Sequence, residues 1–534
     1  MCTGARAALR YTLAVAERYD VVLVGAGHNG LVCAALLARA GLSVCMLEEQ
    51  SVVGGAARTE HPFPRAPGVG QSTGAYLLGL MPPELIAKLG IELPLIRRNP
   101  HYFLPTTEGR YLLFGDDASE MERQFAKFFT QADWRADRAL QAELASLRED
   151  VAPTWLREPS SIEQTAEKFV RAELRTAFVN LCRGSIGDYL ERFGFESDLI
   201  QAMYAVTDGF TGLFGTWDTP GTGMNFLIHN MCRLPGSAGT WMIVRGGMGT
   251  VTSQLAGAAA RDGARIHTDC RVARIIVQSG SVSGVALENG RELRANCVVV
   301  NADPFRMLDM LASEDVPQDL RARIDRYRRD GSTLKVNLCL SGLPRFSCLP
   351  EERGQHAATI HLLPEEQRVL EALRSAFADV RAGRLPEFPS IEWYIHSSVD
   401  ASLSDAAGRH SSALFVQWVP YELSNSTWEA EESRYVQHLL SICDRFAPGT
   451  TDLVVDTFTL HPRKIESYFG MSRGHIHHVD NSFGFDERLP YALPIPGLYA
   501  CGAGCHPGGS VIGASGHNAA MRILKDMGMT QRMS

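Results

Sequence analysis

The spacing of apolar positions near the start of the chain predicts a βαβ unit. Residues Asp20–Val24 form a run dominated by β-branched side chains, which is typical of a buried strand. Apolar residues then recur at helical spacing at Leu31, Ala35 and Leu36, and the segment Val44–Leu47 returns to a strand pattern. The pattern therefore predicts a strand, a helix and a second strand in quick succession.

The later patterns predict a helical segment followed by mixed structure. From about Met81 to Cys232 charged and apolar positions interleave at helical spacing, with a capping-box pattern at Ser185 and Asp188. A glycine-rich turn then precedes a helix from about Thr250 and two strands, and the "ENG" of "GVALENGRELRANCVVVNADP" predicts a hairpin. Helical and strand patterns mix from Phe305 to Ile465, and the tail predicts a strand, a glycine loop and a helix.

This order predicts an α/β protein whose chain leaves a dinucleotide-binding domain and returns to it at the end. We expect residues 19–80, 240–304 and 466–534 to form that discontinuous domain, with residues 81–239 and 305–465 in an inserted substrate domain. Residues 1–18 faintly resemble an amphipathic targeting peptide, and we interpret them as a frayed N-terminal extension.

The charge and the cysteine content of the chain indicate which partners and which cellular compartment to expect. A net charge of -8 without a long basic run disfavours nucleic acid as a partner. Twelve cysteines without C-x-x-C or zinc spacing predict free thiols in a reducing compartment, so we expect a cytoplasmic protein, or a mitochondrial-matrix protein if the chain is eukaryotic. The sequence shows no apolar run long enough to span a membrane. It leaves peripheral membrane contact and a homodimer open.

The glycines after the first strand predict a dinucleotide site. Gly25, Gly27 and Gly30 form G-x-G-x-x-G between a strand and a helix, the context in which this pattern is informative, and Asn29 lies in the same turn. The first glycine permits the tight turn, the second lets a pyrophosphate approach the backbone, and the third lets helix and strand pack closely. Glu48, at the end of the second strand, is placed to bind a ribose diol, with Glu49 as the alternative because strand residues alternate faces.

A second glycine pair, Gly54 and Gly55, adds a resemblance. The succession of strand, G-x-G-x-x-G, helix, strand, Glu and Gly-Gly resembles the FAD-binding start of the amine-oxidase and phytoene-desaturase group of flavoproteins. That group usually has an arginine after the Gly-Gly pair. Here Ala56 occupies the position and Arg58 follows two residues later, so we expect backbone groups around Ala56 to bind the pyrophosphate without a direct role for Arg58.

The other end of the chain carries the same resemblance. The stretch "IPGLYACGAGCHPGGSVIGASGHNAA" is similar to the C-terminal signature of phytoene-desaturase-like enzymes. The resemblance places Gly502 and Ala503 where relatives carry Gly-Asp beside the ribityl chain, and Val272 where backbone groups read the adenine. It places beside the isoalloxazine a loop of four residues: Gly509, Ser510, Val511 and Ile512. The motifs together are most similar to the branch named pyridine nucleotide-disulfide oxidoreductase domain-containing proteins.

The resemblance implies a fold and a reaction class. It implies a Rossmann-type FAD-binding domain of the glutathione-reductase-like fold, with an inserted α+β substrate domain and non-covalent FAD. The implied reaction is dehydrogenation of a C–C or C–N bond in an apolar or unsaturated small molecule by hydride transfer to flavin N5, with oxygen or a quinone as electron acceptor. A redox-neutral flavin-dependent isomerase and a non-catalytic FAD-containing regulatory or partner-binding protein remain alternatives. The redox cysteine pair of a disulfide reductase is missing after the first βαβ unit.

The sequence offers few candidates for catalytic groups. His506, in the "CHPGG" loop that the resemblance places beside the flavin, is the candidate catalytic residue. Tyr204, Asp208 and His229 in the inserted domain are candidates to face substrate. We expect no metal, because the "GHIHH" histidines have only one nearby carboxylate to complete a ligand set: His475, His477 and His478, with Asp480.

Overall fold

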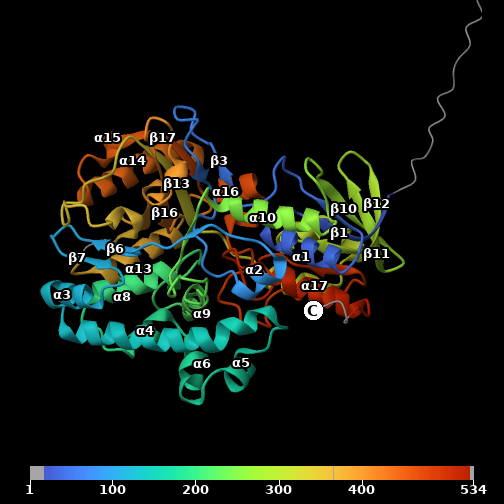
Figure 1. Cartoon of the computed structure of the whole chain (residues 1–534), viewed down its shortest axis with the longest axis horizontal. Coiled ribbons are helices and arrows are strands. Elements are labelled where there is room, and N and C mark those ends of the chain that lie inside the picture. The colour runs from blue at the N-terminus through green and yellow to red at the C-terminus, as the bar shows by residue number, and fades with distance from the viewer. Residues whose placement is uncertain (1–16, 365, 530–534) are drawn as a thin grey trace, which may run out of the picture.

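The computed structural model describes residues 17–364 and 366–529. Figure 1 shows two lobes side by side, each containing a β-sheet. The predicted N-terminal extension lies outside the described residues except for Glu17 and Arg18. Arg18 already begins the first strand, where it pairs with Arg294.

The first lobe contains a mixed sheet in the order β10-β11-β12-β1-β2-β9, with β18 paired to β12. Its strands are β1 (Arg18–Val24), β2 (Val44–Leu47), β9 (Arg265–His267), β10 (Val272–Gln278), β11 (Ser281–Leu287), β12 (Glu292–Val300) and β18 (Leu498–Ala500). The pairs β1–β2, β1–β12, β2–β9 and β12–β18 are parallel, and the remaining pairs are antiparallel. Segments from the start, middle and end of the chain therefore build one sheet.

Helices pack on this sheet through small and apolar residues. Helix α1 (His28–Arg39) lies beside α10 (Met248–Arg261) and α17 (Ala514–Asp526). All residues of α1 from Asn29 to Ala38 are buried, so the helix has no solvent-facing side and its sequence has no polar stripe. Two further helices belong to this lobe: α11 (Pro304–Asp309) and α12 (Gln318–Arg326).

The second lobe contains a sheet in the order β17-β13-β16-β15-β14-β6-β7, antiparallel except between β14 and β6. Its strands are β6 (Tyr102–Pro105), β7 (Tyr111–Phe114), β13 (Thr333–Leu340), β14 (Thr359–Leu362), β15 (Ser390–Tyr394), β16 (His410–Gln417) and β17 (Val454–Leu460). Two small pairs lie outside the large sheets: β3 (Thr59–Glu60) with β4 (Gln71–Ser72), and β5 (Leu95–Ile96) with β8 (Ile243–Val244).

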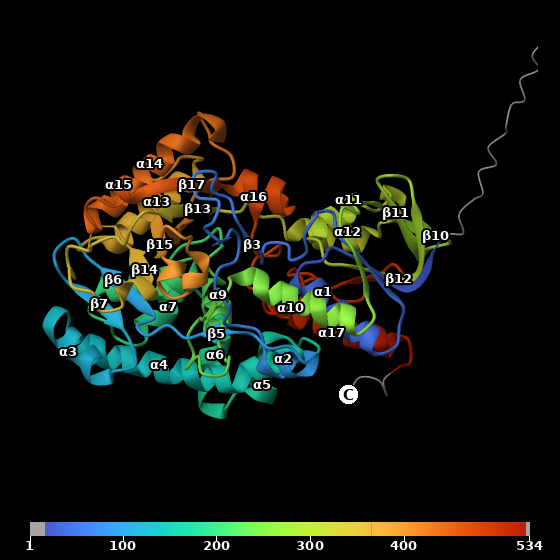
Figure 2. The ribbon, with the colours of Figure 1, turned by 45° about the horizontal axis from the view of Figure 1, so that its top comes forward.

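Most of the remaining helices surround the second sheet or extend below it in Figure 1. They are α3 (Ala118–Phe128), α4 (Gln131–Val151), α5 (Ile162–Phe169), α6 (Arg175–Arg183), α7 (Ile186–Glu191), α8 (Asp198–Tyr204), α9 (Thr222–His229), α13 (Val369–Arg381), α14 (Trp428–Phe446), α15 (Thr450–Leu453) and α16 (Pro462–Phe469). Helix α2 (Pro83–Leu89) packs instead against α1 of the first lobe. Helices α9 and α16 lie near the junction of the two lobes (Figure 2).

Several local predictions are confirmed. Ser185 caps α7 in a complete capping box with Asp188, and the "ENG" turn joins the antiparallel strands β11 and β12. The prediction of an all-helical stretch from Met81 to Cys232 is wrong, because β6 and β7 form a hairpin within it. These strands are short, and β6 pairs with β14 more than 200 residues later, so local periodicity does not reveal them.

No helix of the described part of the chain is long and apolar enough to cross a membrane.

Candidate cofactor and substrate site

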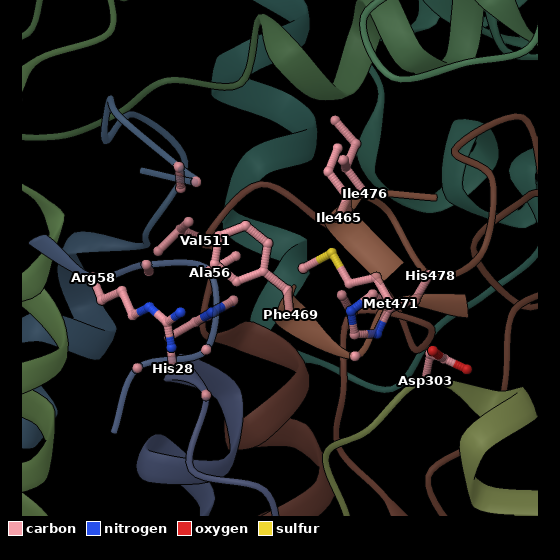
Figure 3. Close-up of a pocket in the computed structure, with 18 of the residues that line it drawn as sticks. His28, Ala56, Arg58, Asp303, Ile465, Phe469, Met471, Ile476, His478 and Val511 are labelled. Carbon is pink, nitrogen blue, oxygen red and sulfur yellow. The ribbon is translucent and has the colours of Figure 1, made fainter. Parts of the chain in front are cut away.

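A cavity of about 600 Å³ runs from the glycine turns of the first lobe to the strands of the second. Its wall begins at Gly25 after β1 and reaches Glu392 on β15. Figure 3 shows part of this cavity, with Arg58 and His28 on one side, Met471 and His478 on the other, and Phe469 between them. Both sheets therefore contribute to one site.

The first glycine turn presents open backbone to this cavity. Gly25 has a φ of +95°, in the left-handed region that glycine adopts without strain. A Cβ added to Gly27, the N-cap of α1, would lie 2.8 Å from Asn301 Nδ2, so a larger residue would displace that side chain. The N-terminus of α1 offers unpaired N–H groups and a favourable dipole for an anion. Gly30 does not line the cavity. A Cβ added to Gly30 would lie 2.5 Å from the Gly25 carbonyl oxygen, so the close packing of α1 on this turn requires glycine.

Two acidic residues follow β2, and they differ in environment. Glu48 is buried and lines the cavity, where its carboxylate accepts hydrogen bonds from the backbone N–H groups of Ala26 (2.7 Å) and Gln50 (2.9 Å). Burial raises the pKa of Glu48 above its ordinary value, against the effect of these hydrogen bonds. Glu49 also lines the cavity but pairs with Arg306 at 3.5 Å and Arg271 at 3.7 Å. Glu48 is thus fixed in position, and Glu49 is engaged by arginines.

The segment after the second glycine pair places Arg58 differently from our expectation. Gly54, Gly55 and Ala56 line the cavity as expected, but so does Arg58, which is buried. Its guanidinium carbon lies 4.8 Å from the ring centre of Tyr468, and its Nε lies 3.1 Å from Glu60 Oε2. These contacts hold the charged group at the cavity wall, on the same side as His28 in Figure 3.

The C-terminal loop contributes fewer residues than the resemblance implies. Ala503, Ser510 and Val511 line the cavity, as does Val272 of β10. Ser510 (φ +88°) and Val511 (φ +55°) have left-handed backbone conformations, which are costly for residues with a Cβ and are concentrated at ligand sites. The cavity wall does not include three further residues of the predicted set, which are buried elsewhere: Gly502, Gly509 and Ile512.

His506 does not reach the cavity. Its ring is buried and packs edge-on against Phe485, with 5.2 Å between ring centres. Burial lowers its pKa to about 3, and its carbonyl oxygen accepts hydrogen bonds from Tyr491 and Ser515. The structure therefore supports a role for His506 in shaping the loop and gives no contact by which it would act on substrate.

The cavity wall has the chemistry of a site for a polar ligand. Five buried polar atoms of lining residues have no hydrogen-bond partner among the described residues: His28 Nε2, Asn29 Oδ1, Arg58 Nε, His477 Nδ1 and His478 Nδ1. Buried polar atoms are rarely left without a partner, so their presence here fits a ligand with hydrogen-bonding groups. The open helix N-terminus and the guanidinium of Arg58 add positive potential for an anionic part of that ligand.

Lys335 of β13 is a lining residue that the pattern analysis missed. It is buried, and its Nζ donates hydrogen bonds to the carbonyl oxygens of Ser72 and Gly74, each at 2.5 Å. Nζ also lies 4.5 Å from the ring centre of Tyr76. Burial holds the pKa of Lys335 well below its ordinary value. The available signal was a lysine within the apolar strand "TLKVNLCL".

The substrate-facing candidates of the inserted domain separate into two groups. Asp208 and His229 line the cavity, and the His229 ring bridges the Asp208 carbonyl oxygen (3.1 Å) and the Ser510 hydroxyl (3.2 Å). Tyr204 does not line it, because its hydroxyl bonds Asp137. Glu392 on β15 also lines the cavity and was not anticipated from the sequence.

Two of the three histidines after α16 contact groups within the protein through Nε2. His475 Nε2 lies 3.4 Å from Asp480, and His477 Nε2 bonds the carbonyl oxygen of Thr211 at 3.0 Å. Among residues 17–364 and 366–529, no three His, Cys, Asp or Glu side chains are grouped so that they could hold a metal ion.

Comparison with known proteins finds relatives along most of the chain. The family model described as "Flavin containing amine oxidoreductase" matches residues 30–364. The chain is 33% identical to "Pyridine nucleotide-disulfide oxidoreductase domain-containing protein 2" of Rattus norvegicus, over 95% of this chain and 94% of that protein. It is 25% identical to a phytoene desaturase of Neurospora crassa, over 92% of this chain and 82% of that protein.

A solved structure of a redesigned putrescine oxidase shares the fold, with a TM-score of 0.60 and 15% identity over 96% of this chain and 99% of that chain. The resemblance noted in the glycine motifs is thus confirmed over most of the chain. The chain belongs to the flavin-containing amine oxidoreductase family.

Proposed function

We propose that this protein is an FAD-dependent oxidoreductase that dehydrogenates a C–C or C–N bond of a small molecule. The observation that supports this most strongly is the continuity of the cavity. The same wall includes both glycine turns of the first lobe, the Ser510–Val511 loop and Lys335 of the second sheet. A cofactor held by the first lobe would therefore be exposed to a substrate held by the second.

Each part of FAD has a partner on the cavity wall in this proposal. Glu48 would accept hydrogen bonds from the ribose, and the backbone of Val272 would contact the adenine. The turn at Gly25–Gly27 and the helix end after it would bind the pyrophosphate. Ala503 would lie beside the ribityl chain, and Ser510 and Val511 would lie beside the ring system. When bound, FAD supplies a two-electron acceptor for the hydride of an activated C–H bond.

Loss of a hydride leaves the substrate as a cation, which forms the neutral C=C or C=N product by releasing a proton to a base. Lys335 fits this role because burial lowers its pKa and favours the neutral amine. Two of its N–H groups are directed to the carbonyl oxygens of Ser72 and Gly74, which leaves the nitrogen lone pair as the acceptor. We therefore assign Lys335 as the proton acceptor in the cavity.

Arg58 provides a test of cofactor binding that the motif alone would not suggest. We expect Arg58→Ala to weaken FAD binding about 10- to 100-fold, because a charged hydrogen bond to the pyrophosphate contributes about 1.5–3 kcal/mol. Titration of apoprotein with FAD, followed by flavin fluorescence, measures this loss. Arg58→Lys keeps the positive charge and should retain part of the affinity. Unchanged affinity in Arg58→Ala would show that backbone groups suffice.

The enzymatic part of the proposal is tested by anaerobic photoreduction of the purified protein, followed by rapid mixing with oxygen or a soluble quinone. We expect fast reoxidation by one of these acceptors, and bleaching of the oxidised flavin by at least one compound in a metabolite screen. Slow reoxidation with both acceptors and no bleaching would indicate a protein that holds FAD without turnover. Turnover only after prereduction, with no acceptor consumed, would indicate an isomerase. Either result would contradict the proposal.

A further inference from the structure

A buried histidine connects the second lobe to the C-terminal loop of the first. His229 is the last residue of α9, and its ring lines the cavity. Its Nε2 lies 3.2 Å from the Ser510 hydroxyl, and its Nδ1 lies 3.1 Å from the Asp208 carbonyl oxygen. Asp208 belongs to a π-helical turn, η3 (Ala205–Gly209), and such turns occur frequently at functional sites. One side chain thus bonds a loop that lies 281 residues later in the chain.

The partners of His229 fix the position of its proton. A carbonyl oxygen can only accept a hydrogen bond, so Nδ1 carries the proton and donates it to Asp208. Burial lowers the pKa of His229 to about 4, so the ring is neutral at neutral pH and Nε2 keeps its lone pair. Nε2 therefore accepts the hydrogen bond that the Ser510 hydroxyl donates.

The second-lobe end of this connection is fixed by asparagines. Asn225 of α9 donates from Nδ2 to the Asp208 carbonyl oxygen at 2.8 Å, and Asn230 Nδ2 donates to Asp208 Oδ2 at 3.0 Å. Asn225 Oδ1 in turn accepts a hydrogen bond from Asn481 Nδ2 at 3.0 Å. The turn that contains Asp208 is therefore tied to α9, and His229 presents Nε2 to Ser510 from a rigid support.

The loop that His229 contacts needs such support. Ser510 (φ +88°) and Val511 (φ +55°) are consecutive residues in the left-handed region, a conformation that residues with a Cβ keep only where their surroundings enforce it. Gly508 (φ +139°) and Gly513 (φ +78°), on either side, adopt positive φ without this cost. Val511 is held by burial, and Ser510 is held by its hydrogen bond to His229.

The backbone N–H groups of this loop are free. In the part of the chain that the structure describes, no N–H group of residues 508–512 donates a hydrogen bond to a protein acceptor. Ser510 is half-buried, and the other residues of this segment are buried. Buried N–H groups without a partner are rare, so this run of free donors points to a ligand with acceptor atoms.

We propose that His229 is a positioning residue for the flavin: through the Ser510 hydroxyl it holds residues 508–512 so that their N–H groups donate to the ring system of FAD. The proposal rests on the proposed function of the cavity, which places Ser510 and Val511 beside that ring system. Two-electron reduction adds negative charge to the ring, and fixed N–H donors stabilise such charge. His229 therefore raises the reduction potential of the bound FAD by acting through Ser510.

The reduction potential of the bound FAD, measured by equilibration with a reference dye, tests this role. His229→Phe keeps an aromatic ring but removes both hydrogen bonds. We expect its potential to fall by about 30 mV, a tenfold weaker preference for reduced flavin, as expected for loss of one or two hydrogen bonds to the ring. His229→Gln places an amide oxygen near the position of Nε2 and should restore at least half of this difference. An unchanged potential in His229→Phe would overturn the proposal.

Two substitutions of Ser510 separate positioning from direct contact between His229 and the ring. Ser510→Ala removes the hydroxyl but keeps the cost of a left-handed backbone, so its potential should fall as in His229→Phe. Ser510→Gly also removes the hydroxyl, yet glycine adopts this backbone without strain, so its potential should stay near that of wild type. Equal potentials for these two variants would contradict the role of the hydrogen bond.

The double variant His229→Phe/Ser510→Gly completes the cycle. Because glycine no longer needs the hydrogen bond, adding His229→Phe to Ser510→Gly should leave the potential unchanged. A further fall of about 30 mV in the double variant would show that His229 acts on the ring directly, and it would overturn the proposal.

His438→Phe is the matched control. His438 on α14 also bonds a backbone carbonyl oxygen, that of Glu387, and it lies outside the cavity wall. Its potential should equal that of wild type. A fall as large as that of His229→Phe would show that the shift is unspecific and would overturn the assignment to His229.

The measurement can fail independently of the proposed function. A preparation without flavin would refute FAD binding and the positioning role together. A flavin-containing protein that turns over substrate but keeps its potential in His229→Phe would refute only the positioning role. The predicted potentials in a protein without turnover would support the positioning role and refute only the enzymatic proposal.

Discussion

The Lys335→Met variant is expected to reduce substrate-dependent flavin reduction by about 10²- to 10⁴-fold, the range over which a positioned general base accelerates a reaction. Methionine preserves the length and apolar stem of the side chain but cannot take a proton. Its effect should therefore fall on the rate of reduction rather than on FAD content. Stopped-flow measurement of flavin bleaching, with the compound found in the metabolite screen, gives this rate directly.

The pH dependence separates a proton acceptor from a structural lysine. Burial lowers the pKa of Lys335, so the amine is neutral above that lowered pKa and becomes protonated as the pH falls through it. The wild-type rate should therefore decline on the acid side, below the ordinary lysine range, and this limb should be absent in Lys335→Met. Lys335→Arg keeps the hydrogen-bond donors but stays protonated, so it should not restore the rate. Full activity in Lys335→Arg would show that the lysine only organises the loop at Ser72–Gly74.

The Gly30→Ala variant is expected to destabilise the first lobe by about 1–3 kcal/mol, the usual cost of overpacking. The new Cβ would lie 2.5 Å from the Gly25 carbonyl oxygen and 3.2 Å from the side chain of Asn301. The Gly25 carbonyl oxygen belongs to the backbone of the turn that faces the cavity. To relieve the contact, α1 must shift away from this turn. We expect a lower melting temperature and FAD content below half of wild type.

Gly257→Ala is the matched control for this substitution. Gly257 lies within α10, and nothing lies within 4 Å of a Cβ added there. The same chemical change should therefore leave FAD content unchanged and stabilise the protein by up to about 1 kcal/mol, the helix preference of alanine over glycine. Equal melting temperatures and FAD contents for the two variants would contradict the packing role assigned to Gly30.

The parts of the site that could be predicted are those whose function depends on local backbone. The turn at Gly25–Gly27 and the position of Glu48 follow from residues adjacent in the chain, and the structure places all three at the cavity wall. The hairpin of β11 and β12 is local in the same way.

The parts that could not be predicted depend on distant segments. Arg58 is buried because Tyr468 and Phe469 of α16 pack against it from some 400 residues later in the chain. Lys335 is buried because β13 is an inner strand between β16 and β17. The motif predicted a catalytic role for His506, yet its ring packs against Phe485 and does not line the cavity. The sequence pattern identifies which residues could bind or react. The positions of these three side chains depend on packing between segments that are distant in the chain.

The absorption spectrum of the purified protein tests the central claim most directly. We expect flavin bands at about 375 and 450 nm, and release of about one FAD per chain when the protein is denatured, since the cavity has one set of glycine turns at its wall. Chromatography of the released cofactor distinguishes FAD from FMN. A correctly folded preparation that lacks these bands and takes up no added FAD would contradict the account of the site.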